Sequence, residues 1–269
     1  MYPCVSVRCD TFGVPNPRNA LLNRRVFVHR FFVTILLLAA PASYGQEPPP
    51  PGQTWAGNFG AGLSLTKGNS DTKNVNLSLQ LAQRIDARNV AKYDAFYLRG
   101  DKDGDLIVDR TTFGGRDEYT FSPLMYAFGD VHYLRDKFKE IDYLVTPTVG
   151  GGYHILKEKD LDLAAEGGLG FVVEKDAGLS RETSGALTAK QLLTWKFSPT
   201  ATLGEVASGL WKTKSLGDAL YHVEASLASD ITAKSQLKVS AMDDYKTRPP
   251  APGIKKNDIS LIAALVMKF

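Results

Sequence analysis

The sequence predicts an all-β protein: an antiparallel up-and-down transmembrane β-barrel of about 12 strands. Three observations predict this fold. Apolar and polar residues alternate along many segments, aromatic residues gather near the ends of those segments, and the last segment alternates up to a terminal phenylalanine. Alternation alone would also suit a soluble β-sandwich, so the strand number with its turn lengths, the aromatic residues and the terminal segment decide between the two folds.

Residues 1–45 have the pattern of a secretion signal. A polar, basic stretch (residues 23–30) precedes an unbroken apolar run of ten residues (31–40), which ends at a proline. A transmembrane helix needs roughly 20 residues, so this run is too short to span a bilayer. Small residues at 40–42, or equally at 43–45, suit cleavage by a signal peptidase. We therefore expect a removable signal peptide, with a short retained membrane anchor as the alternative.

Removal of this signal changes the cysteine content and the charge of the chain that remains. Cys4 and Cys9 both lie in the signal, so the mature chain has no disulfide framework and no thiolate metal site. The signal holds five of the 32 Lys and Arg residues and one of the 29 Asp and Glu residues, which leaves 27 against 28, a net charge of −1. We therefore expect no nucleic-acid partner. A start codon assigned too far upstream would explain residues 1–22, which precede the basic stretch.

A proline-rich spacer and twelve candidate strands follow the signal. Residues 46–54, which begin QEPPPPGQ, favour extended polyproline geometry, so we expect a short periplasmic spacer there. In the barrel itself (residues 55–269) the first strand sets the pattern, because Trp55, Phe59 and Leu63 alternate with small and polar residues. The same alternation predicts strands near 55–66, 73–85, 90–100, 109–121, 125–135, 141–153, 161–173, 182–197, 200–212, 218–230, 235–245 and 257–269.

The connections between these strands predict how the barrel is oriented. Twelve is an even number, so both ends of the barrel chain lie on the periplasmic side. Alternate connections are short, and the others include three longer, charged segments that we expect to be outer loops: Arg99–Asp109, Glu174–Arg181 and Lys246–Lys256. Short periplasmic turns and longer outer loops are the asymmetry expected of such barrels.

The alternation is imperfect in two places. Gly114-Gly115 is interpreted as a β-bulge that resets it, and the two faces of the ninth strand stay unassigned. Three polar or charged side chains fall on the predicted lipid face, where charge is unfavourable near the midplane: Asp117, Gln191 and Glu205.

Aromatic residues predict two belts at the membrane interfaces. One set lies at the strand ends assigned to the periplasm: Trp55, Tyr119, Phe121, Tyr153, Trp195, Phe197 and Phe269. The other set lies at the opposite ends: Tyr97, Phe113, Tyr133, Tyr143, Phe171, Trp211, Tyr221 and Tyr245. The middles of the strands hold mostly Leu, Val, Ala and Gly, whereas a soluble sandwich would concentrate its aromatic residues there.

The end of the chain resembles the signal by which outer-membrane barrels are recognised for assembly. Apolar residues alternate up to the last position, and we expect the barrel assembly machinery to read five of them: Leu261, Ala263, Leu265, Met267 and Phe269. The alternative is an ordinary last strand that happens to end in phenylalanine.

Four segments of the mature chain resemble a known family: WAGNFGAGLSLTKGNSDTKNVNLSLQL, LRDKFKEIDYLVTPTVGGGYHIL, DLDLAAEGGLGF and DDYKTRPPAPGIKKNDISLIAALVMKF. They resemble the YdiY-like family, a domain of unknown function whose members carry the label of salt-induced outer membrane proteins. The resemblance covers nearly all of residues 55–269, and its most specific parts are the TKGNSDT turn and the proline-rich loop before the last strand. It implies a barrel in the bacterial outer membrane and supplies no catalytic residues.

Ionisable residues recur on the face that the alternation directs into the barrel. Lys92 and Asp94 lie two apart on one strand, as do Arg116 and Glu118 on the next, so neighbouring rows can pair across the wall. The pattern favours a polar lumen filled by salt-bridged side chains, because small barrels are commonly filled, and the alternative is a narrow channel. The candidate lumen-facing residues are Lys92, Asp94, Arg116, Glu118, Asp130, His132, Asp162, Glu166, Lys190, His222, Glu224, Asp230 and Lys238.

No motif in the mature chain points to catalysis, to a metal or to a cofactor. Its three histidines are His132, His154 and His222, and no pattern places a serine nucleophile beside one of them. The acidic residues of RGDKDGDLIVD only partly match a calcium loop, because the glycine is out of place and the terminal glutamate is missing. We therefore expect no enzyme, with a lipase-type barrel as a remote alternative.

The expected function is a structural or envelope-stress role, related to salt or osmotic stress, for an outer-membrane barrel with a filled polar lumen. The alternative is a narrow channel for ions or small solutes. The expected partners are outer-membrane lipids and, during biogenesis, the barrel assembly machinery.

Overall fold

The computed structural model describes residues 48–50, 52–66, 72–137, 140–249 and 256–269. The predicted signal peptide, the centre of the TKGNSDT turn and most of the proline-rich loop before the last strand lie outside these ranges. No helix in the described ranges has the length and hydropathy needed to cross a membrane.

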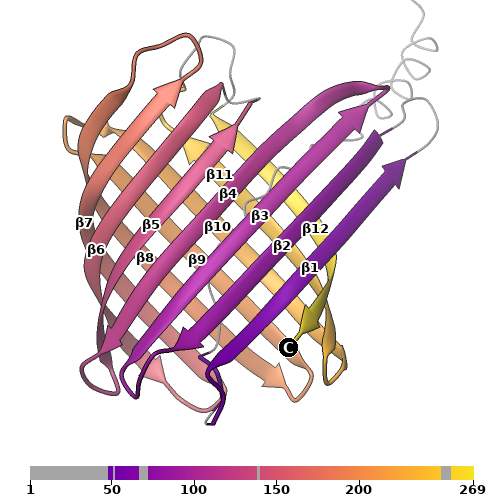
Figure 1. Cartoon of the computed structure of the whole chain (residues 1–269), viewed down its shortest axis with the longest axis vertical. Helices are drawn as coiled ribbons and strands as arrows, with labels where there is room; N and C mark the ends of the chain where they lie inside the picture. Colours follow the sequence, from indigo (N-terminus) through magenta and orange to yellow (C-terminus); the bar gives the residue numbers. More distant parts are fainter. Residues whose placement is uncertain (1–47, 51, 67–71, 138–139, 250–255) are drawn as a thin grey trace, which may run out of the picture. The chain divides into compact units, whose positions relative to one another are not determined.

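Twelve antiparallel strands form a closed barrel, in which each strand pairs with its neighbours in sequence and the first pairs with the last (Figure 1). This confirms the predicted fold class and strand number. The strands are β1 (Trp55–Thr66), β2 (Thr72–Arg84), β3 (Asn89–Lys102), β4 (Asp105–Thr120), β5 (Met125–Asp136), β6 (Ile141–Lys157), β7 (Leu161–Asp176), β8 (Glu182–Ser198), β9 (Ala201–Lys212), β10 (Ser215–Thr232), β11 (Ser235–Lys246) and β12 (Asn257–Lys268).

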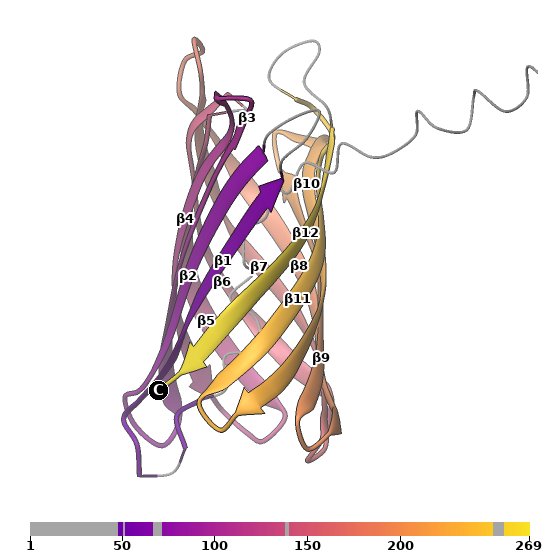
Figure 2. The same cartoon turned by 90° about the vertical axis from the view of Figure 1, so that its right-hand side faces the viewer.

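The start of β1 and the end of the chain lie at one end of the barrel, which we call the terminal mouth; the opposite end is the far end (Figure 2). The seam between β1 and β12 pairs Asn58 with Lys268 at one limit and Ala61 with Leu265 at the other. Next to the Asn58–Lys268 pair, toward the terminal mouth, Gly57 and Phe269 exchange two backbone hydrogen bonds of 2.9 and 3.0 Å. The turns at the terminal mouth are all short: 85–88, 121–124, 158–160, 199–200 and 233–234.

One segment predicted as an outer loop is largely strand, and another begins as strand. The segment Arg99–Asp109 continues β3 and β4, which meet in a tight turn at Asp103 and Gly104, with φ angles of 54° and 92°. The segment Glu174–Arg181 likewise begins inside β7, which extends to Asp176. Charge was a misleading sign of a loop here, because inward-facing charged residues near the far end pair within the lumen.

The predicted β-bulge at Gly114-Gly115 is wrong. Both residues keep the regular register, opposite Asp94 and Tyr93, and the shift between β3 and β4 lies at Gly100 and Asp101 instead. Glycine is required at position 114 for another reason: a Cβ atom there would collide with the Asp94 carboxylate.

The outer face of the barrel is apolar and carries aromatic side chains toward both ends. At the terminal mouth Tyr119 packs edge-on against Phe121, and Trp195 packs against Phe197, with ring centroids 5.2 and 5.6 Å apart. Nearer the far end, Phe113 of β4 packs against Tyr133 of β5 at 6.1 Å. In β9, Val206 and Lys212 are buried, so the even-numbered positions face inward and Glu205 faces outward.

Candidate functional site

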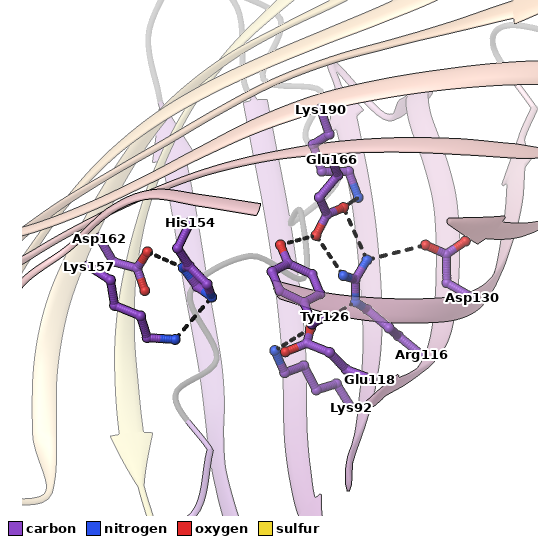
Figure 3. Close-up of polar contacts among 10 residues, drawn as sticks. All are labelled: Lys92, Arg116, Glu118, Tyr126, Asp130, His154, Lys157, Asp162, Glu166 and Lys190. Carbon is purple, nitrogen blue, oxygen red and sulfur yellow. Dashed lines mark hydrogen bonds and ion pairs between the residues drawn. The ribbon is translucent and has the colours of Figure 1, made fainter. Parts of the chain in front are cut away.

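The side chains inside the barrel form the candidate site, and the terminal half of the lumen contains a charged network centred on Arg116 (Figure 3). The guanidinium of Arg116 lies 2.6 Å from Glu166, 3.3 Å from Glu118 and 3.5 Å from Asp130. The same group lies over the ring of Phe128, 4.0 Å from its centroid. One cation therefore ties together carboxylates from β4, β5 and β7.

Two lysines and a tyrosine extend this network along the wall. The ammonium group of Lys92 lies 3.1 Å from Glu118, and that of Lys190 lies 3.6 Å from Glu166. The hydroxyl of Tyr126 donates a 2.8 Å hydrogen bond to Glu166. These contacts join strands from β3 to β8, which lie side by side around half of the barrel.

A second polar group lies closer to the terminal mouth. The His154 Nδ1 atom is 2.6 Å from a carboxylate oxygen of Asp162, and its Nε2 atom is 3.0 Å from Nζ of Lys157 (Figure 3). The carboxylate fixes the orientation of the imidazole ring through Nδ1, which is how second partners commonly orient histidines. His154 and Lys157 were not among the predicted lumen residues.

Two cavities in series follow these networks. The vestibule, at the terminal mouth, has a volume of about 370 Å³. The chamber, deeper in the lumen, has a volume of about 190 Å³, and His132, Glu166 and Lys190 line both. Pro48 lines the vestibule, and Arg84 donates a hydrogen bond to the carbonyl of Pro49, so part of the proline-rich segment lies against the vestibule.

The far half of the lumen is crossed by side chains from opposite walls. A guanidinium nitrogen of Arg110 on β4 lies 3.1 Å from a carboxylate oxygen of Asp244 on β11. The other oxygen of Asp244 lies 2.8 Å from Nδ1 of His222 on β10. Going around the wall, β12, β1, β2 and β3 separate β11 from β4, so this ion pair spans the interior of the barrel.

Two apolar clusters accompany that ion pair. In the first, Met242 of β11 packs against Phe96, Leu98 and Val108 of β3 and β4, and both Leu98 and Val108 are 1% exposed. The second joins β6, β7 and β8 through Ile141, Leu144, Val172 and Ala186. Leu210 and Leu220 pack against the second cluster and also line the chamber, so the chamber ends where this cluster begins.

A third group of charges lies near the far end. Lys212 forms an ion pair with Glu174 and lies 2.9 Å from Asp218. Lys246 lies 3.8 Å from Glu174 and 3.6 Å from Asp176. Lys212 and Glu174 are 4% and 6% exposed, so the lumen at this level leaves little room for water beside them.

The thirteen candidate residues fall into two groups in the structure. Glu224, Asp230 and Lys238 belong to β10 and β11, where Lys238 lies 3.2 Å from Glu224 and Asp230 lies 2.6 Å from Lys268. The other ten line the vestibule or the chamber: Lys92, Asp94, Arg116, Glu118, Asp130, His132, Asp162, Glu166, Lys190 and His222.

Sequence reasoning missed the residues that close the far half. Arg110 and Asp244 continue the inward alternation of their strands, but the pattern alone does not indicate that they meet. Glu174, Asp176 and Lys246 were assigned to outer loops. Within the described ranges, no group of three or more His, Cys, Asp or Glu residues is arranged to hold a metal ion.

Solved structures of bacterial outer-membrane barrels share this fold. An outer membrane channel from Pseudomonas putida F1 is 14% identical, with a TM-score of 0.54 over 86% of this chain and 100% of that chain. The translocator domain of autotransporter NalP from Neisseria meningitidis is 12% identical, with a TM-score of 0.47 over 80% of this chain and 86% of that chain. The NanC porin is 10% identical, with a TM-score of 0.46 over 79% of this chain and 97% of that chain.

At these identities the likeness concerns the fold alone. No curated protein matched the sequence. A family model described as "Protein of unknown function, DUF481" matches residues 59–269 and confirms the resemblance to an uncharacterised family. The chain therefore belongs to this DUF481 family.

Proposed function

We propose that this protein is a structural barrel of the bacterial outer membrane whose lumen is closed in its far half. One observation carries the proposal: Arg110 and Asp244 meet at 3.1 Å across the lumen, beside the apolar contact of Met242 with Leu98 and Val108. An ion entering from the vestibule would have to break both contacts to pass.

Breaking these contacts is unfavourable for physical reasons. Removing one member of a buried ion pair, or pulling the pair apart, leaves an uncompensated charge in surroundings with little water. Displacing Met242 would in addition expose apolar surface inside the barrel. The side chains that cross the lumen therefore link opposite walls and are expected to resist flattening or splaying of the barrel.

Conductance in planar bilayers tests the proposal directly. The purified full-length protein should insert without producing steps of ionic current. The double variant Arg110→Ala with Met242→Ala removes both contacts and should conduct, whereas a silent double variant would place the block at the charges around Lys212 and Lys246 instead. The control is Lys175→Ala, which removes an exposed ion pair with Asp142 and should stay silent. Stable current steps from the parent protein would refute the closed lumen.

A narrow channel for ions or small solutes is the second candidate. The vestibule and the chamber lie in series, and the similarity in fold to the Pseudomonas putida F1 channel also favours it. In this case the parent would conduct, and Arg116→Ala with Glu118→Ala would change the ratio of cation to anion permeability because both residues line the vestibule.

The finer part of the proposal is a role in tolerance of salt or osmotic stress. It rests on the four sequence segments that resemble salt-induced outer membrane proteins. A strain that lacks the gene should grow more slowly than its parent at high NaCl and recover when the gene is restored. Equal growth of the two strains across the salt range would remove this part of the proposal and leave the closed barrel unaffected.

A further inference from the structure

The outer, lipid-facing surface contains a groove of about 700 Å³ over β3 to β7. Gly115 and Gly129 contribute to its lining where the other strands carry side chains. Val131, Val149 and Leu169 also line it, and all three are strongly exposed. The groove begins at Ile85, in a turn at the terminal mouth, and so opens at the membrane interface.

The barrel's own packing does not account for the two glycines. On the inner face, glycines make room for lumen side chains: a Cβ atom at Gly152 would collide with the ring of Tyr126. On the outer face, a Cβ atom at Gly115 would meet nothing within 4 Å, and one at Gly129 would meet only Val149, at 3.9 Å. Glycine weakens a strand interior and often marks a place where a ligand comes close. These positions therefore point to an occupant outside the chain.

An exposed carboxylate lies at the same place. Asp117 lines the groove, is exposed, and stands directly opposite Gly129 in the pairing of β4 with β5. A charge on the lipid face of a barrel is unfavourable, and the penalty falls toward the interface. Asp117 is two residues from Tyr119 of the aromatic belt at the terminal mouth, which is the depth that lipid headgroups reach.

We propose that this groove binds a phospholipid with an amine headgroup. The ammonium group lies against Asp117, and an acyl chain lies along the floor of Gly115 and Gly129, against Val149 and Leu169. The ammonium compensates a carboxylate that otherwise faces the membrane, and the absent side chains give the acyl chain close contact with the backbone.

A second copy of the barrel fits the groove less well than a lipid. A two-fold symmetric interface brings the same patch of both copies together. If the groove formed its centre, it would place two Asp117 carboxylates near each other in apolar surroundings, and like charges at an interface are strongly unfavourable. The charge of the groove thus favours a cationic partner over a copy of itself.

Native mass spectrometry of the full chain in detergent tests the proposal. The protein is titrated with dioleoylphosphatidylethanolamine or with dioleoylphosphatidylglycerol, which has the same chains and no amine. We expect the parent to retain the amine lipid about fivefold more often, the ratio that one exposed charge pair provides. Asp117→Asn should bind both lipids equally. Gly115→Leu with Gly129→Leu should retain neither, because the new side chains fill the floor.

The matched control is Glu205→Gln, which removes an outward carboxylate on β9, away from the groove, and should keep the preference for the amine lipid. Each variant is first shown to be folded by its mobility before and after heating in SDS electrophoresis. Equal retention of the two lipids by the parent would overturn the proposal. So would an unchanged preference in folded Asp117→Asn, a preference lost equally in Glu205→Gln, or a dimer mass that the glycine variants abolish.

Discussion

The two halves of the lumen are built from the same alternation of inward and outward side chains, but one half contains cavities and the other is crossed by side chains. In the terminal half, the network of Arg116 joins strands on one side of the barrel and leaves the vestibule and the chamber beside it. In the far half, Arg110 reaches Asp244 from the opposite wall, and Met242 packs against Leu98 and Val108 across the lumen. An ionisable residue that faces inward therefore does not close a barrel by itself; closure depends on whether its partner lies beside it or across from it.

The difference also predicts how costly each half is to disturb. Charges beside the cavities can be hydrated when a partner is lost. In the far half, Arg110 and Met242 are 5% and 4% exposed, so a lost contact there leaves a buried charge or a cavity. Mutations in the far half should therefore have the larger effects.

The largest effect is expected for Arg110→Ala. It breaks the 3.1 Å ion pair between Arg110, which is 5% exposed, and the partly buried Asp244, and this should lower the free energy of unfolding by about 3–5 kcal/mol. Urea unfolding in lipid vesicles, followed by electrophoretic mobility, measures the change. The double variant Arg110→Met with Asp244→Leu removes both charges and should recover most of the loss. If Arg110→Ala were as stable as the parent, the far half of the lumen could not exclude water as described.

Met242→Ala should follow closely. Truncation leaves a cavity beside Phe96, Leu98 and Val108, and such changes cost about 2–5 kcal/mol. The same unfolding assay applies, with Met242→Leu as the volume-conserving control that should cost less than about 1.5 kcal/mol. If the two variants lose the same stability, Met242 does not pack as the far half requires.

Arg116→Ala with Glu118→Ala should cost less than Arg110→Ala, because Glu166 keeps Lys190 and Tyr126 as partners and the vestibule beside these residues has room for water. The variant should also stay silent in planar bilayers, since the far half remains closed. Current through this variant would move the barrier into the terminal half and reverse the comparison.

The smallest effect on stability is expected at the end of the chain. Deleting Phe269, or changing it to Asp, should reduce the amount of protein that reaches the outer membrane. The Asp variant keeps the backbone hydrogen bonds to Gly57, so the unfolding midpoint of its assembled form should stay nearly unchanged. Fractionation of membranes and immunoblotting measure the amount. Lys268→Ala should do little, although Lys268 pairs with Asp230 at 2.6 Å, because that pair is about one third exposed. Parent-like amounts of both Phe269 variants would mean that the terminal residue is not read during assembly.

The sequence was sufficient to predict the strands of the barrel wall and insufficient to predict which side chains meet across the lumen. Alternation is a property of each strand, so it predicted the twelve strands and directed Arg116 and Glu166 to the inside. Contact across the lumen depends on which strands stand opposite each other and on how far the walls lie apart, and no local pattern contains this. Arg110 and Asp244 are separated by 134 positions, and Lys246 was hidden in a segment whose charge suggested a loop.

The short seam between β1 and β12 has a consequence for the order of events in biogenesis. Among the described residues, register pairing at this seam runs from Asn58 to Ala61 on β1, whereas β1 pairs with β2 from Trp55 to Thr66. An open sheet of these strands would have two exposed edges, and such edges readily pair with other chains. Closing the seam removes both edges, and the two backbone hydrogen bonds between Gly57 and Phe269 extend the pairing to the last residue of the chain.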